Sequence, residues 1–137
     1  MKLSNKSIMP LVHGVYQIKE NEGYLTFSHY DDNQIEYLKF NQFFCDRATF
    51  SSSVTLEFET DATEIGLDYK IFVVGSLDTI DIYANNIAVC ITHLEGLPEK
   101  GKLTFKLPEG KKKVSVYLPI DVNLGIKNLR LEGKWRN

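Results

Sequence analysis

Apolar and polar residues alternate strictly over Val54–Asp61, after a short run of serines. The apolar side chains share one parity: Val54, Leu56 and Phe58. Successive side chains of a β-strand point to opposite faces, so this segment is predicted to be a strand buried on one side. The same period of two runs from Ile65 to Val73, where it predicts a second strand.

Turn signals divide the rest of the chain into further short strands. Thr79–Ala84 and Ile87–Ile91 flank Asn85-Asn86, and asparagine tolerates the positive φ that a two-residue hairpin turn needs. A hairpin is therefore predicted there. Val15–Ile18 and Tyr24–Phe27 are predicted as two more short strands around a polar, glycine-containing stretch.

A second hairpin is predicted farther along the chain. Leu103–Leu107 and Val114–Leu118 both alternate, and the turn residues of Pro108–Lys112 separate them. Pro119 should end this hairpin, because proline has no N–H to donate to a neighbouring strand.

The final apolar run changes parity. Positions 122, 124 and 126 share one parity and positions 129 and 131 the other, which predicts a β-bulge near Lys127-Asn128. Helical spacing is expected only at Asp31–Leu38, where an aspartate can cap one short helix. Many short strands with frequent turns indicate an all-β fold, an antiparallel β-sandwich or jelly roll with that single helix near residues 31–38.

Length and charge limit the functions to consider. The 137 residues suffice for one domain, and 16 basic against 18 acidic residues give a net charge of −2. No overall basic field exists to attract phosphate backbones, so nucleic acid is not an expected partner. The basic run Lys111–Lys113 follows a turn and is interpreted as a solvated hairpin tip.

The sequence has no stretch of about 20 apolar residues, and Met1–Met9 does not have the form of a signal peptide. We therefore expect no membrane partner and a cytoplasmic location. Cys45 and Cys90 match no zinc-binding or redox spacing and are interpreted as two free thiols. Their separation in sequence leaves a disulfide between them open.

Residues for catalysis are not found in a recognisable arrangement. The sequence has no Gly-x-Ser-x-Gly, Gly-Asp-Ser or Asp-x-x-His pattern, and its three histidines lack metal-site spacing. Glycine-rich phosphate loops are also missing. We therefore predict no catalytic residue, no metal site and no cofactor for this chain.

Aromatic residues give the candidates for binding. Tyr37, Phe40 and Phe44 precede Arg47 in an irregular segment, while Tyr83 and Tyr117 have outward parity in their strands. Aromatic rings with polar tips stack on sugars or fill a partner's groove. Packing beneath a loop is the other interpretation of the phenylalanines.

Several segments resemble the N-terminal β-sandwich of two-domain SGNH (GDSL-type) esterases, a lipase/acylhydrolase family. The resemblance extends over roughly residues 11–133. The matching segments are Phe43-Phe44-x-x-Arg47-Ala48, Val54–Asp61 with Ile65, Asp81–Tyr83, Leu107–Lys111, Val114–Pro119 and Ile126–Leu129.

The resemblance implies a domain that precedes a flavodoxin-like hydrolase domain, whose serine, oxyanion-hole and histidine blocks have no counterpart here. On this basis we expect an N-terminal tail at residues 1–10, one β-sandwich domain at 11–133 and the start of a linker at 134–137. The expected partner is an SGNH-type catalytic domain of the same parent chain, and carbohydrate or an acylated substrate is a possible ligand.

Two functions follow as hypotheses. The first is a non-catalytic accessory domain that packs on the hydrolase domain and helps to shape its cleft, with Tyr37, Phe40, Phe44 and Arg47 as candidates for the contact face. An internal salt bridge to Asp46 or Asp61 is the competing interpretation of Arg47. The alternative function is a stand-alone carbohydrate-binding module that uses Tyr83 and Tyr117.

Overall fold

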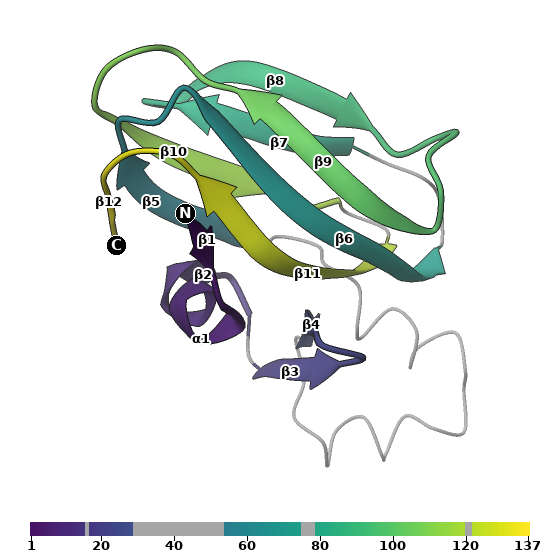
Figure 1. Cartoon of the computed structure of the whole chain (residues 1–137). Helices are drawn as coiled ribbons and strands as arrows, with labels where there is room; N and C mark the ends of the chain where they lie inside the picture. The colour runs from purple at the N-terminus through teal and green to yellow at the C-terminus, as the bar shows by residue number, and fades with distance from the viewer. Residues whose placement is uncertain (16, 29–53, 75–78, 120–121) are drawn as a thin grey trace.

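The chain forms an antiparallel β-sandwich in a computed structural model that describes residues 1–15, 17–28, 54–74, 79–119 and 122–137 (Figure 1). The first sheet has the order β3 (Gln17–Asn21), β4 (Tyr24–Ser28), β11 (Val122–Leu131), β6 (Glu64–Val74), β9 (Lys100–Lys106), with β1 (Lys2–Leu3) paired to β11. The second has the order β12 (Trp135–Arg136), β5 (Thr55–Thr60), β10 (Lys112–Tyr117), β7 (Thr79–Ala84), β8 (Ile87–His93), with β2 (Val12–His13) paired to β5. The predicted all-β sandwich is confirmed.

Strands β4 to β11 follow a jelly-roll path between these sheets. The chain passes from one sheet to the other at nearly every connection, and β4-β11-β6-β9 faces β5-β10-β7-β8. The predicted hairpin between Leu103–Leu107 and Val114–Leu118 is wrong for this reason. β9 pairs with β6 in the first sheet, whereas β10 lies between β5 and β7 in the second.

The core lies between the sheets and contains the apolar parity of each strand. In β5 the inward residues are buried and the outward ones are partly exposed, as the alternation predicts. The hairpin β7–β8 also forms as predicted, with φ values of 50° and 67° at Asn85 and Asn86. Fully buried side chains from both sheets meet in this core, among them Phe27, Phe58, Ile65, Tyr69, Ile82 and Phe105.

The predicted bulge in β11 is confirmed. The register between β11 and β6 shifts between Lys127 and Arg130, and Asn128 has a φ of 54°. The bulge brings two donors to the carboxylate of Asp68 on β6: Asn128 Nδ2 at 2.8 Å and Arg130 Nη1 at 2.6 Å. Burial raises the pKa of Asp68, but these hydrogen bonds outweigh it, so the pKa lies below its usual value.

This network predicts a stability change at acid pH. Because the folded-state pKa of Asp68 is depressed, its contribution is present above the unfolded-state pKa of about 3.9 and is lost as pH falls through the folded value. We expect D68N to have a free energy of unfolding about 1–3 kcal/mol lower than the unaltered chain at pH 7. As the pH falls below about 4, the free energy of unfolding of D68N should decrease less than that of the unaltered chain. Urea unfolding from pH 7 to pH 2.5 measures both effects; parallel pH curves would contradict the assignment.

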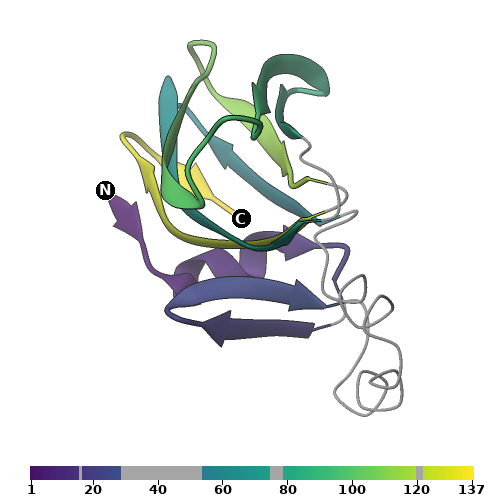
Figure 2. The same ribbon diagram turned by 90° about the vertical axis from the view of Figure 1, so that its right-hand side faces the viewer.

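Residues 1–10 were expected to be a tail but form part of the packed domain. β1 pairs with β11, helix α1 (Asn5–Ile8) follows, and the 3-10 turn η1 (Met9–Leu11) leads into β2. Ile8 and Leu11 have no exposed surface. Figures 1 and 2 show this purple segment against one side of the sandwich, so these apolar side chains anchor it to the core.

The expected linker at residues 134–137 also differs from the structure. β12 pairs with β5, with Trp135 opposite Thr60 and Arg136 opposite Glu59. The indole of Trp135 packs against the core, and this contact stabilises the pairing of the short strand with β5. The helix predicted near residues 31–38 lies outside the described residues; the short helix that the structure describes is α1.

Candidate functional site

The outer surface of the second sheet carries a group of side chains that we call the tyrosine face: Tyr83, Tyr117, Asp81, Ser115 and Ile91. The strands place them together because Tyr117 lies opposite Asp81, Ser115 opposite Tyr83, and Asp81 opposite Ile91. Residues directly opposite in an antiparallel pair share a face, so all five side chains project away from the core. Tyr117 is 45% exposed and Ile91 59% exposed.

The two tyrosine rings contact each other. Their centroids are 5.1 Å apart and their planes meet at 64°, an edge-to-face arrangement. Ser115, which is buried, lies beside Tyr83 and adds little bulk. The result is a shallow surface on which Tyr117 is the most exposed ring.

Asp81 is the polar centre of the tyrosine face. It is flanked by Tyr117 on β10 and by Ile91 on β8, and Tyr83 follows two residues later on the same side of β7. Its Oδ1 atom is buried and accepts no hydrogen bond from any residue that the structure describes. A carboxylate oxygen left without a donor retains capacity to accept one from a ligand.

A second carboxylate, that of Glu57, lies on the same sheet surface, on the side of Ser115 away from Tyr83. Glu57 lies opposite Ser115 and places its oxygens 3.6 Å from Nε2 of His13 and 3.6 Å from Nζ of Lys113. These distances are those of weak, solvent-exposed ion pairs. Glu57 therefore faces the ammonium group of Lys113 and the imidazole of His13, whereas Asp81 forms no salt bridge with any described residue.

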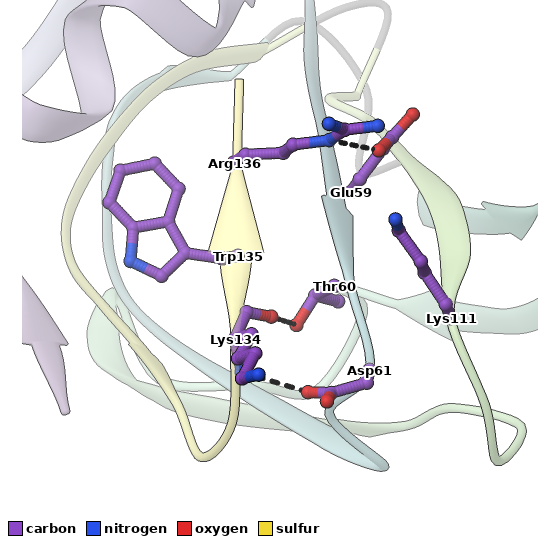
Figure 3. A pocket seen from close by; sticks show the side chains of 7 residues that line it. All are labelled: Glu59, Thr60, Asp61, Lys111, Lys134, Trp135 and Arg136. Atoms are coloured by element: carbon purple, nitrogen blue, oxygen red, sulfur yellow. Dashed lines mark hydrogen bonds and ion pairs between the residues drawn. The ribbon is translucent and has the colours of Figure 1, made fainter.

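A hollow of about 480 Å³ opens where β12 docks on β5 (Figure 3). Its polar groups are used to hold the strand. Thr60 Oγ1 donates to the carbonyl of Lys134 at 2.6 Å, and the N–H of Lys134 donates to Asp61 Oδ1 at 2.8 Å. Figure 3 shows Trp135 pointing to the opposite side of β12 from Arg136.

Two of the charged side chains around this hollow are paired with each other. A hydrogen bond from Arg136 to Glu59 lowers the pKa of Glu59 and raises that of Arg136. Lys112 lies nearby, is only 4% exposed and donates to the carbonyl of Gly110 at 2.7 Å. Burial lowers its pKa, so the middle lysine of Lys111–Lys113 does not belong to a solvated tip as the sequence suggested.

The structure brings together one of the two predicted groups of binding residues. Tyr83 and Tyr117 are partly or largely exposed and touch each other. The other candidates lie outside the described residues: Tyr37, Phe40, Phe44 and Arg47. Sequence reasoning missed Asp81, although it has the outward parity of Tyr83 and this signal could have identified it.

The described residues contain no group of three or more histidine, cysteine, aspartate or glutamate side chains that could hold a metal ion. Cys90 is a partly buried free thiol, and Cys45 lies outside the described ranges. Within those same ranges, no helix has the length and apolarity needed to cross a membrane.

Comparison with known proteins gives structural matches only. No protein-family model matches the chain, and no curated protein matches it significantly. Among solved structures, the chain is similar to the salicylyl-acyltransferase SsfX3 from a tetracycline biosynthetic pathway, with a TM-score of 0.80 and 21% identity. It is also similar to a GDSL-like lipase from Bacteroides ovatus, with a TM-score of 0.69 and 12% identity.

These two matches include 99% of the present chain but only 40% and 42% of the acyltransferase and the lipase. A family 35 carbohydrate-binding module from Clostridium thermocellum is similar over nearly its whole length, covering 98% of each chain, with a TM-score of 0.50 and 9% identity. At these identities the likeness establishes the fold, which occurs both within larger chains and as a separate module.

Proposed function

We propose that this chain is a non-catalytic accessory domain that packs on an SGNH-type hydrolase domain and helps to shape its substrate cleft. One observation carries the proposal: the whole β-sandwich matches 40% of a larger acyltransferase chain at a TM-score of 0.80. The resemblance of the sequence to the first domain of SGNH esterases supports the same role. The sequence contains no catalytic serine motif of its own.

Tyr37, Phe40, Phe44 and Arg47 are the proposed contact residues for the hydrolase domain or its substrate. The guanidinium of Arg47 can bind a carboxylate or an ester oxygen with two hydrogen bonds. The competing partner Asp61 already accepts the N–H of Lys134. A carboxylate can accept several hydrogen bonds, so an internal salt bridge with Asp46 or Asp61 still competes with an external partner for Arg47.

The test begins with the coding sequence beyond Asn137, where the proposal expects a Gly-Asp-Ser block within a few tens of codons. The two-domain protein should hydrolyse p-nitrophenyl esters, and R47A should lower kcat/KM about tenfold or more, the effect of losing a hydrogen bond to a charged group. K102A removes an exposed cation from β9 and serves as the control. If R47A keeps its turnover and melting temperature, Arg47 is not an interface residue. A reading frame without a hydrolase domain would contradict the accessory role.

The second candidate function is carbohydrate binding without a catalytic partner. It is favoured by the contact between Tyr83 and Tyr117 on an exposed sheet surface. The likeness to the family 35 carbohydrate-binding module supports it further. Both candidates share the fold, so they differ in whether the chain packs on a hydrolase domain through Tyr37, Phe40, Phe44 and Arg47 or binds a sugar at Tyr83 and Tyr117.

A further inference from the structure

We propose that the tyrosine face binds one ring of a neutral oligosaccharide, with Tyr117 stacking on the sugar and Asp81 accepting a hydrogen bond from a hydroxyl group. The inference rests on the carbohydrate-binding role proposed above and specifies its site and ligand class.

Tyr117 supplies the stacking surface. Nearly half of the side chain is exposed on the sheet surface, and its contact with Tyr83 limits the orientations that the ring can adopt. A ring held in place before binding loses little conformational entropy when a ligand covers it. Ile91, on the far side of Asp81, extends the apolar surface toward β8.

Asp81 supplies the polar contact. None of the described residues donates a hydrogen bond to its buried Oδ1 atom, although nearly all buried polar atoms in folded proteins have a donor. Because Oδ1 is buried, a ligand above the sheet can reach it only after the carboxylate turns, and the terminal torsion of an aspartate is broad enough to allow this. A hydroxyl donor would then satisfy the carboxylate and fix the position of the stacked sugar.

Neighbouring charges favour a neutral ligand. Asp81 has no cationic partner among the described residues, and Glu57 lies across Ser115 from Tyr83. The ammonium group of Lys113 and the imidazole of His13, both near this surface, already face Glu57. An acidic sugar over Tyr117 would meet the uncompensated carboxylate of Asp81 and be repelled.

The shape of the surface favours an extended chain over a small enclosed ligand. Ser115 is small and buried, so no wall rises between Tyr83 and Glu57. A hollow of about 290 Å³ lined in part by His13, Glu57 and Lys113 lies farther along the same sheet. An oligosaccharide across the strands can therefore reach more of the surface than one monosaccharide covers.

The experiment uses the full 137-residue chain. A glycan array with neutral and acidic oligosaccharides identifies the preferred class, and calorimetry with the strongest neutral oligosaccharide measures its Kd. Y117A should weaken binding about tenfold or more by removing the stacking ring, and D81N should weaken it severalfold while keeping the side-chain shape. I87A is the matched control, because Ile87 is exposed on β8 but lies opposite Ala84 and outside the tyrosine face.

The proposal is supported if neutral oligosaccharides bind, Y117A and D81N weaken that binding, and I87A leaves it unchanged while all variants keep their melting temperature. It is overturned if no neutral oligosaccharide binds, if only acidic sugars bind, or if Y117A and D81N both retain full affinity. Binding of a lysine-rich peptide in place of sugars would also overturn it, since Asp81 and the tyrosines would then recognise a cation. None of these failures affects the ester-hydrolysis assay of the longer protein, so the accessory role is judged separately.

Discussion

Replacing Phe58 with alanine should reduce the free energy of unfolding by about 3–5 kcal/mol, because the substitution empties the centre of the core. Phe58 is 2% exposed and lies in β5 opposite Val114 of β10. The lost apolar contacts and the remaining cavity both contribute, since a packed interior collapses only in part around a missing ring. Thermal unfolding should show a melting temperature lower by roughly 10 °C or more.

E57A, one residue earlier, provides the control for this prediction. Glu57 lies on the same strand with the opposite parity, and its ion pairs with His13 and Lys113 are long and exposed. Its removal should change stability by less than about 1 kcal/mol. Equal losses in F58A and E57A would mean that β5 is not buried on one side, and the sandwich assignment would fail.

A methyl group at Gly133 should detach β12 from the sheet and destabilise the domain by about 2–4 kcal/mol. Gly133 has a φ of 120°, a backbone conformation that residues other than glycine rarely adopt. A Cβ there would also lie 2.3 Å from Oδ1 of Asp61, the atom that accepts the N–H of Lys134. G133A therefore combines backbone strain with the loss of a hydrogen bond that anchors the strand.

Two variants separate these contributions. G96A introduces a side chain at a φ of 82° with nothing within 4 Å of the new Cβ, so it reports strain alone. In G133A/D61A the clash is absent, and the double variant should lose less stability than the two single variants together. Trp135 fluorescence during urea unfolding follows the docking of β12 directly. A G133A loss no larger than that of G96A would show that the Asp61 contact is unimportant.

Local features of the fold could be predicted from the sequence because local residues determine them. The alternation in β5, the Asn85-Asn86 turn and the change of parity near Lys127-Asn128 each depend on a few neighbouring positions. Period-two burial and positive φ are local requirements that particular residue types meet. These predictions are all confirmed.

The pairing of strands could not be predicted in the same way. β9 and β10 have the pattern of a hairpin, but the jelly roll places them in opposite sheets, and alternation carries no information about which sheet a strand joins. The prediction of a tail at residues 1–10 was wrong for a related reason. Leu3, Ile8 and Leu11 are buried by contacts with distant residues and form no regular period.

The candidate site was predictable in part. Outward parity was predicted for Tyr83 and for Tyr117, and both side chains do point away from the core, since both belong to strands with clear alternation. That the two rings touch depends on β10 lying beside β7, a contact between strands about 30 positions apart in sequence. Asp81 acquires its importance only through this pairing, because an unpartnered oxygen cannot be recognised before its neighbours are known.

Each end of the chain is tied to a residue far from it in sequence, and this has a consequence for how the domain can be extended or fused. The Met1 amino group lies 3.3 Å from Glu132, and Asn137 donates a hydrogen bond to the carbonyl of Pro10. Chain ends that are held in this way stay ordered, so a protein fused at either end should leave these two contacts intact if the terminal segments are to remain docked.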